Sequence, residues 1–360
     1  KEDGKLYGKG TIDDKGPAMD SLFAMKAIRD SGIQLKRRYR LIVGLDEESG
    51  FSRCLGKYLA VEETPNYSFS PEAFFPVINA EKGIIRFDLV RKGEQTRSDV
   101  VLDKMIAGDR YNVVPDSAAA YFSGDTAKAK TLLTPLADED STVKEEGGKV
   151  ILSVKGLVAH AMEPDRGKNA LQKLLKKLVS VKEFAAMPEI ATAQRLISDR
   201  TDGEQLGIVM EDAASGKLTC NAAAIKLENG SYSMRFDVRY PVTADSEMVI
   251  QSIREAAAAQ GAELIIPQHK KPLYLPAEMP FIQMLVGAYN DLTGEQGKPF
   301  SIGGGSYCRF LDNAVSFGPV FPHEQEMAHH PNEFVSLDSL RKMTHIYAEA
   351  LYRINERSIG

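Results

Sequence analysis

Cysteine is scarce in this sequence. The 360 residues include only Cys54, Cys220 and Cys308, an odd number at wide spacing. This spacing excludes a disulfide framework and a zinc site built from cysteines, and it fits reduced thiols in a cytosolic protein. Cys308 lies beside a glycine-rich loop, but a nucleophilic cysteine needs an activating partner, and the sequence shows none near it. We therefore expect a cytoplasmic protein whose chemistry does not depend on thiols.

Long apolar runs and an excess of positive charge are also missing. No stretch approaches the roughly 18 apolar residues that a membrane-spanning helix needs. The 45 Lys and Arg residues are outnumbered by 50 Asp and Glu residues, which gives a formal net charge of −5. A protein that binds nucleic acid would be expected to present a basic face. The polar segment Lys-Glu-Asp-Gly-Lys at the start does not resemble a secretory signal. We therefore expect no nucleic-acid partner and no membrane.

The length and the order of elements predict two domains of mixed α/β type. At 360 residues the chain exceeds the size at which a single hydrophobic core stops growing. Residues 16–32 have helical apolar spacing, and residues 39–45 are an apolar run typical of a buried strand. A helix over 54–60 and a strand around 66–69 follow. This β-α-β alternation predicts a mostly parallel sheet with helices on its faces.

The pattern changes after Glu81-Lys82-Gly83. Strands are predicted over residues 83–92, 149–155 and 231–240, with helices over 168–182 and 247–260. We interpret residues 81–265 as an α+β domain inserted into a first domain formed by residues 1–80 and 266–360. A helix over 281–292, a strand over 314–317 and a helix over 337–354 complete the first domain. The acidic stretch 137–146 is expected to be a solvated loop.

Acidic residues and histidines follow several of these elements. They are Asp13-Asp14 before the first helix, Glu47-Glu48 after the 39–45 strand, Glu72 after the 66–69 strand, and His329-His330 in a proline-rich loop. Each alone has an ordinary alternative, as a helix N-cap or as a solvated surface group. Together they are the ligand types of Zn²⁺, Mn²⁺ or Co²⁺. Two such ions about 3.5–4 Å apart need a bridging carboxylate, and a further carboxylate must stay unligated as general base.

Seven segments of the sequence carry a resemblance to a known family. They are Gly8-Lys9-Gly10-Thr11-Ile12-Asp13-Asp14-Lys15-Gly16, Asp46-Glu47-Glu48-Ser49-Gly50, Ser70-Pro71-Glu72-Ala73, Glu81-Lys82-Gly83, Asn112-Val113-Val114-Pro115, Ser301-Ile302-Gly303-Gly304-Gly305-Ser306-Tyr307 and Ala328-His329-His330-Pro331-Asn332-Glu333. In this order they resemble the co-catalytic zinc peptidases, which include carboxypeptidase G, aminoacylase, succinyl-diaminopimelate desuccinylase and carnosinase. Several are most similar to bacterial dipeptidases of the PepV type. The resemblance implies an α/β zinc-peptidase catalytic domain with a mostly parallel sheet, plus an inserted α+β lid domain.

The resemblance also implies a dinuclear metal centre, with Zn²⁺ as the expected metal and Mn²⁺ or Co²⁺ as alternatives. Asp13 would bridge the two ions, and in that family it is joined to the next residue by a cis peptide. Glu48 and His329 would ligate one ion, and Glu72 would ligate the other. Glu47 would be the general base.

Further residues are implied to bind the substrate. His160 would reach in from the lid domain to stabilise the oxyanion, because a tetrahedral intermediate needs donors aimed at its developing charge. Asn112 and Arg239 would hold the C-terminal carboxylate of a peptide, and Gly303, Gly304 and Gly305 would line it. Arginine suits this task because it can form two parallel hydrogen bonds with a carboxylate. From the residues alone, Arg239 could equally form a surface salt bridge.

The sequence departs from the family pattern in two places. The family has a His-x-Asp segment upstream of the Asp-Asp motif, and its histidine ligates the metal that Glu72 would hold. This chain begins twelve residues before Asp13 and has no such segment, so we expect it to be a fragment of a longer protein. PepV-type dipeptidases usually carry Asp where Glu72 stands, whereas related acylases and carboxypeptidases often use Glu.

These observations predict a metal-dependent dipeptidase that hydrolyses short peptides with a free C-terminal carboxylate. The large inserted domain favours a monomer. Two alternatives stay open. One is an N-acyl amino acid deacylase that uses the same site, and the other is a non-catalytic peptide-binding protein, if the upstream histidine is truly absent.

Overall fold

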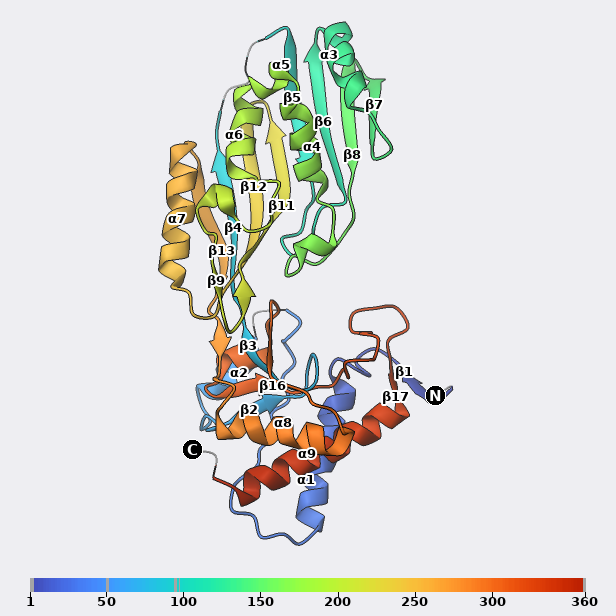
Figure 1. Ribbon diagram of the computed structural model, residues 1–360, viewed down its shortest axis with the longest axis vertical. Helices are drawn as coiled ribbons and strands as arrows, with labels where there is room; N and C mark the ends of the chain where they lie inside the picture. The colour runs from blue at the N-terminus through green and yellow to red at the C-terminus, as the bar shows by residue number, and fades with distance from the viewer. Residues whose placement is uncertain (1–2, 50–51, 94–95, 97, 359–360) are drawn as a thin grey trace. The chain divides into compact units, whose positions relative to one another are not determined.

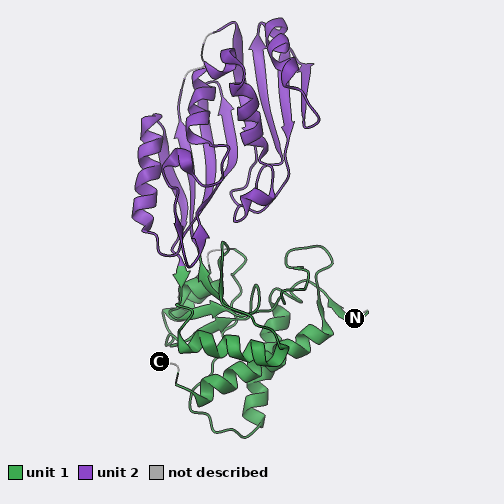
Figure 2. Ribbon diagram, in the orientation of Figure 1, with its two compact units in different colours: residues 1–81, 273–360 green, residues 82–272 purple. Residues whose placement is uncertain are grey.

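The computed structural model describes residues 3–49, 52–93, 96 and 98–358 (Figure 1). The chain divides into two compact units (Figure 2). Unit 1 consists of Lys1–Glu81 together with Leu273–Gly360, and unit 2 consists of Lys82–Pro272. Each unit has its own cluster of buried apolar side chains, so each is described by itself.

Unit 1 contains four α-helices among its described residues, and the sequence predicts all four to within a few residues. They are α1 (Lys15–Asp30), α2 (Arg53–Leu59), α8 (Pro280–Thr293) and α9 (Leu337–Glu356). The ends follow local chemistry: Pro17 stands in the first turn of α1, and the side chain of Ser336 caps α9 by accepting a hydrogen bond from the Ser339 amide. Helix α9 packs against both α1 and α8. No helix in the described parts of the chain is long and apolar enough to cross a membrane.

The main sheet of unit 1 is mixed, whereas the sequence predicts a mostly parallel one. The strands of unit 1 are β1 (Lys5–Tyr7), β2 (Ser68–Ser70), β3 (Ile78–Glu81), β14 (Leu273–Tyr274), β15 (Phe300–Ile302), β16 (Ala314–Ser316) and β17 (Phe334–Ser336). Strand β16 pairs in parallel with β2, as does β15 with β3. Strands β14 and β16 each run antiparallel to β3. The reason lies partly in the connection, because the chain leaves unit 1 at the end of β3 and returns beside it on β14.

The prediction of a buried strand over residues 39–45 is wrong. This segment has no regular secondary structure and pairs with no strand among the described residues, and Val43 and Leu45 are 67% and 94% exposed. A strand needs a neighbour about 4.8 Å away to satisfy its backbone. Here a cavity of about 1310 Å³ is lined by this segment together with residues of and around β2. The apolar run is therefore placed beside a cavity instead of beside a strand.

Aspartate 20 is an unusual residue in the packing of α1 against α9. Its side chain is only 8% exposed, its Oδ1 accepts a hydrogen bond of 2.8 Å from Thr344 Oγ1, and its Oδ2 has no partner. Burial raises the pKa of Asp20 to about 6, although the Thr344 hydrogen bond opposes the rise. An ionised carboxylate in this position therefore opposes folding.

We expect Asp20→Asn to stabilise the protein in a pH-dependent way. The unfolded carboxyl group titrates near pH 3.9, so the folded protein holds the extra proton up to about pH 6. The free energy of unfolding thus falls as the pH rises through this window and stays low above it. The substitution should raise it by about 1–3 kcal/mol at pH 8 and by little at pH 4. Urea denaturation at both pH values measures this, and an equal effect at both would contradict it.

The described residues of unit 2 are built around an antiparallel sheet of eight strands. Its strands are β4 (Gly83–Arg91), β5 (Val100–Ala107), β6 (Ser117–Gly124), β7 (Ser141–Glu146), β8 (Lys149–Lys155), β9 (Glu211–Asp212), β10 (Gly216–Lys217), β11 (Thr219–Glu228), β12 (Ser231–Tyr240) and β13 (Glu263–Lys270). The order in the large sheet is β13-β4-β12-β11-β5-β6-β8-β7, and β9 pairs with β10 separately. The predicted strands β4, β8 and β12 are confirmed to within one residue.

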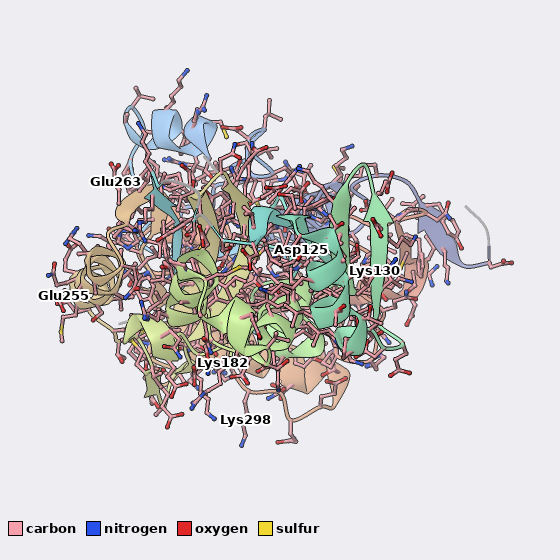
Figure 3. The ribbon with its side chains drawn as sticks, turned by 90° about the horizontal axis from the view of Figure 1, so that it is seen from above. Asp125, Lys130, Lys182, Glu255, Glu263 and Lys298 are labelled. Atoms are coloured by element: carbon pink, nitrogen blue, oxygen red, sulfur yellow. The ribbon has the colours of Figure 1, made fainter. Side chains whose placement is uncertain are left out.

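Helices cover this sheet. They are α3 (Thr126–Leu133), α4 (Ala170–Val179), α5 (Lys182–Ala185), α6 (Pro188–Leu196) and α7 (Ser246–Ala259), with 3-10 turns η1 (Thr134–Leu136), η2 (Pro164–Arg166) and η3 (Glu204–Leu206). Leu171, Leu174, Leu175 and Leu178 form one apolar face of α4 and are buried in the core. Glu255 on α7 and Lys130 on α3 lie at opposite sides of the unit (Figure 3).

The prediction of a solvated loop over residues 137–146 is also wrong in part. Residues Ser141–Glu146 form β7, the edge strand of the large sheet. Most side chains of this strand are exposed, and Glu145 forms an ion pair with Lys130 on α3. Charged side chains of this kind protect a sheet edge from pairing with other chains.

Candidate metal centre

Three side chains from distant parts of unit 1 converge at one point. Asp13 lies two residues before the start of α1, Glu48 lies in the loop before α2, and His329 lies in the loop before β17. The Nε2 atom of His329 is 2.9 Å from Asp13 Oδ2 and 3.5 Å from Glu48 Oε2. One ligand atom from each residue lies within 4.8 Å of the other two. The structure thus brings together three of the four residues that the sequence predicts as metal ligands.

The spacing of these atoms fits a divalent metal ion. Zinc binds imidazole nitrogen and carboxylate oxygen at about 2.0–2.2 Å, so two ligand atoms in a tetrahedral site are about 3.3 Å apart. The distances from His329 Nε2 to the two carboxylates lie on either side of this value. Two carboxylates and one imidazole are also a ligand set that zinc accepts.

Further carboxylates surround this group. Burial and the negative charges of Glu72, Asp13 and Glu47 raise the pKa of Asp14 to about 9. Burial, together with Glu47 and Glu81, raises the pKa of Glu72 to about 8. The Oδ1 atom of Asp14 is buried without a hydrogen-bond partner. Carboxylates that repel one another in this way are stabilised by a nearby cation, so the cluster fits the binding of positive charge.

Glu72, the fourth predicted ligand, lies outside the group of three atoms but belongs to the same cluster. Its Oε1 accepts a hydrogen bond of 3.2 Å from the Tyr307 amide. Glu47, Glu48, Glu72 and both aspartates line the same cavity of about 1310 Å³. The peptide bond between Asp13 and Asp14 is cis, as the resemblance implies.

Glu333 positions the loop that carries Asp13. Its side chain is buried, and its Oε1 accepts hydrogen bonds from the amides of Ile12 (3.0 Å) and Asp13 (3.3 Å). Burial alone would raise the pKa of Glu333, but the amides of Gly10, Ile12 and Asp13 hold it below its usual value. Glu333 is not among the residues predicted for the site, although it ends the same motif that contains His329.

The predicted glycine-rich loop also lies in unit 1. Gly303, Gly304 and Gly305 directly follow β15, which pairs with β3. The carbonyl oxygen of Gly304 accepts a hydrogen bond of 2.6 Å from Arg309 Nη2. A side chain at Gly305 would place its Cβ only 2.7 Å from Arg309 Nε, so the residue must be small for the guanidinium to lie against the loop.

The remaining predicted residues gather within unit 2. Val113 and His160 form an isolated β-bridge, and the Ala161 amide donates a hydrogen bond of 2.9 Å to the Asn112 carbonyl. Burial and then the charge of Arg239 hold the pKa of His160 below its usual value. Asn112, His160 and Arg239 therefore lie in one region of unit 2.

Arg239 is fixed by a buried ion pair. It is only 2% exposed, and its Nε and Nη2 atoms donate to the two carboxylate oxygens of Asp237 at 2.5 and 3.0 Å. Arg86 on β4 donates to the same carboxylate at 2.9 Å and to Gln268 on β13 at 2.8 Å. The surface salt bridge that the sequence left open is thus a buried one, with Asp237 between two arginines.

Comparisons with known proteins place the chain among peptidases. The protein named "Putative dipeptidase YtjP" from Bacillus subtilis (strain 168) is 36% identical over 361 residues, which are 98% of this chain and 77% of that protein. Two solved structures share the fold at low identity. Aminopeptidase PepT from Bacillus cereus ATCC 10987 has a TM-score of 0.53 and 14% identity, over 98% of this chain and 75% of its own. Human carnosine dipeptidase 1 has a TM-score of 0.50 and 13% identity, over 99% and 74%.

The family description "Peptidase family M20/M25/M40" matches residues 1–353, almost the whole chain. Such a match includes the segments that hold Asp13, Glu48 and His329 as well as all of unit 2. The chain therefore belongs to peptidase family M20/M25/M40.

Proposed function

We propose that this peptidase is a metal-dependent dipeptidase that acts on short peptides with a free C-terminal carboxylate. The observation that carries the proposal is the convergence of Asp13, Glu48 and His329. Of these, Asp13 and Glu48 line a cavity that Asp14 and Glu72 also line. The dipeptidase names of relatives such as YtjP support the choice of substrate.

In this proposal Asp13 would be a ligand shared by two divalent cations, most suitably Zn²⁺, with Mn²⁺ or Co²⁺ as alternatives. Glu48 and His329 would hold one cation, and Glu72 would hold the other. When bound, the ions polarise the scissile carbonyl and lower the pKa of the attacking water to about 7. Glu47 then accepts the proton of this water on a carboxylate oxygen and passes it to the leaving amine nitrogen.

Unit 2 would act as a lid that completes the substrate site. His160 would donate a hydrogen bond to the oxyanion, for which a neutral imidazole suffices, and its lowered pKa favours that form at neutral pH. Arg239 and Asn112 would hold the substrate carboxylate, and the Asp237 ion pair keeps the guanidinium in one orientation for this task. Gly303, Gly304 and Gly305 would line the peptide.

The test of this function is a substrate comparison on the full-length, metal-loaded protein. We expect kcat/KM for dipeptides to exceed that for N-acetyl and N-succinyl amino acids by about tenfold or more. A tenfold ratio corresponds to a difference of about 1.4 kcal/mol in binding the transition state. The reverse order would favour the alternative, an N-acyl amino acid deacylase, which the presence of Glu72 in place of Asp keeps open. Less than one metal ion per chain after addition of Zn²⁺ or Mn²⁺, measured by mass spectrometry, would favour a non-catalytic peptide-binding protein.

We also propose that the protein is a cytoplasmic monomer without nucleic-acid or membrane partners. The monomer rests on the length of unit 2, residues 82–272. Light scattering tests it, and a dimer would contradict it.

A further inference from the structure

A short 3-10 turn, η4 (Tyr307–Phe310), is bonded to the buried carboxylates of unit 1 through its first amides. The Ser306 amide donates to Glu81 Oε2 at 3.2 Å, and the Tyr307 amide donates to Glu72 Oε1 at 3.2 Å. The Cys308 amide is satisfied by Ser306 Oγ at 3.1 Å. The amides of the N-cap residue Ser306 and of the first residue of the turn, Tyr307, therefore fix Glu81 and the candidate metal ligand Glu72.

The side chain of Tyr307 reaches the loop that carries Asp46, Glu47 and Glu48. Its hydroxyl oxygen accepts a hydrogen bond of 3.3 Å from the Asp46 amide and lies 3.1 Å from Cys54 Sγ. Burial, followed by the contact with Cys54, raises the pKa of Tyr307 to about 12. A Cβ at Gly44 would lie 2.2 Å from the Tyr307 hydroxyl, so the loop backbone packs directly on this group.

The other end of η4 is anchored by a buried ion pair. Glu81 is fully buried, and its Oε2 is 2.7 Å from Arg309 Nε. Ser306 Oγ donates a further hydrogen bond of 2.5 Å to Glu81 Oε1. Because Ser306 before the turn and Arg309 within it both bind the Glu81 carboxylate, the turn has little freedom to move. The turn is therefore a rigid support, and the Tyr307 hydroxyl extends from it to the loop of Glu47 and Glu48.

We propose that Tyr307 is a positioning residue of the metal centre, whose amide orients Glu72 and whose hydroxyl orients the loop that carries Glu47 and Glu48. One residue then sets the separation between a ligand of one cation, a ligand of the other and the general base. The inference rests on the proposed function for its effect on turnover, but its effect on metal binding does not depend on which substrate is hydrolysed.

The test is Tyr307→Phe, which keeps the ring and the amide that binds Glu72 and removes only the hydroxyl. We expect the Kd for Zn²⁺, measured by competition with a chromophoric chelator, to rise about 3- to 10-fold, the effect of losing one hydrogen bond. We expect kcat for a dipeptide to fall by a similar factor, with KM changed less than twofold, because the substrate contacts are made elsewhere.

The matched control is Tyr39→Phe. Tyr39 lines the same cavity, and its hydroxyl donates a hydrogen bond of 2.9 Å to the Leu351 carbonyl, away from both acidic loops. This variant should lower Tm by as much as Tyr307→Phe while leaving Zn²⁺ affinity and kcat unchanged. If Tyr307→Phe also changes only Tm, the hydroxyl merely supports the fold and the proposal is overturned.

A second variant tests the proposal in case Tyr307→Phe does not fold. Cys54→Ala removes a hydrogen-bond partner of the Tyr307 hydroxyl and should weaken Zn²⁺ binding about 2- to 3-fold. If Tyr307→Phe does not fold, unchanged Zn²⁺ affinity in Cys54→Ala overturns the proposal. If the wild-type protein binds Zn²⁺ but cleaves no dipeptide, the proposed function fails, and the Zn²⁺ affinities alone decide the role of Tyr307.

Discussion

Glu47→Gln should almost abolish dipeptide hydrolysis and leave metal binding intact. Glu47 lines the cavity of the metal centre, and its charge acts on both Asp14 and Glu72. Glu48, the neighbour of Glu47, is the glutamate that contributes an atom to the group formed with Asp13 and His329. A general base contributes about 10²–10⁴-fold to the rate, and glutamine cannot accept the proton. We therefore expect kcat to fall by about 10²–10⁴-fold, with Zn²⁺ stoichiometry and KM close to those of the wild-type protein.

The matched control is Glu62→Gln, which removes the same charge from an exposed pair with Arg40. Exposed ion pairs contribute about 0–1 kcal/mol, so this variant should keep both stability and turnover. Steady-state kinetics on metal-loaded proteins and metal analysis of each variant measure the two effects separately. A Glu47→Gln variant that keeps more than a tenth of the wild-type kcat would show that another group takes the proton.

Candidate ligands for a metal centre could be selected from the sequence because short motifs contain them. Asp13, Glu48 and His329 each stand in a segment whose residue types and order are readable in the sequence. The groups that hold those ligands were not predicted. Glu333 and Tyr307 act through contacts with residues far away in the chain, such as Ile12 and Asp46. Such contacts exist only in the tertiary structure, and no local pattern encodes them.

The helices of unit 1 were predictable for a different reason. Their apolar spacing and end signals, such as Pro17 in α1, are local properties of the chain. Strands depend more on their neighbours. Residues 39–45 have the composition of a buried strand, yet they border a cavity. The alanine-rich β6 (Ser117–Gly124) is a strand because β5 and β8 pair with it, and alanine gives no clear signal of this.

The edge strand β7 had a local signal that composition concealed. Its many charged residues suggest a solvated loop, but Gly147-Gly148 stands between it and β8, and a glycine pair between two strands is typical of a two-residue hairpin. Burial of charge was the harder problem. Nothing in the sequence around Arg239 indicates that Asp237 and Arg86 would neutralise one another inside the sheet of unit 2.

His329→Asn should remove most of the stabilisation that Zn²⁺ gives to the protein. An ion present at 100 times its Kd stabilises the folded state by about 2.7 kcal/mol. Even a change in the surroundings of metal ligands weakens binding about 10–100-fold, so loss of the imidazole itself should weaken it by at least about 100-fold. At the same Zn²⁺ concentration the stabilisation should then fall below about 0.5 kcal/mol. Urea denaturation with and without Zn²⁺ measures both values.

The metal-free protein should tolerate this change, which separates metal binding from folding. His329 has an exposed side chain and a φ of 63°, and asparagine adopts this left-handed conformation readily. The matched control is His330→Asn, because His330 is its exposed neighbour but contributes no atom to the group of three. It should keep the full Zn²⁺ stabilisation. Equal losses in the two variants would mean that the imidazole of His329 is not a ligand, since only a general disturbance of the loop affects both positions alike.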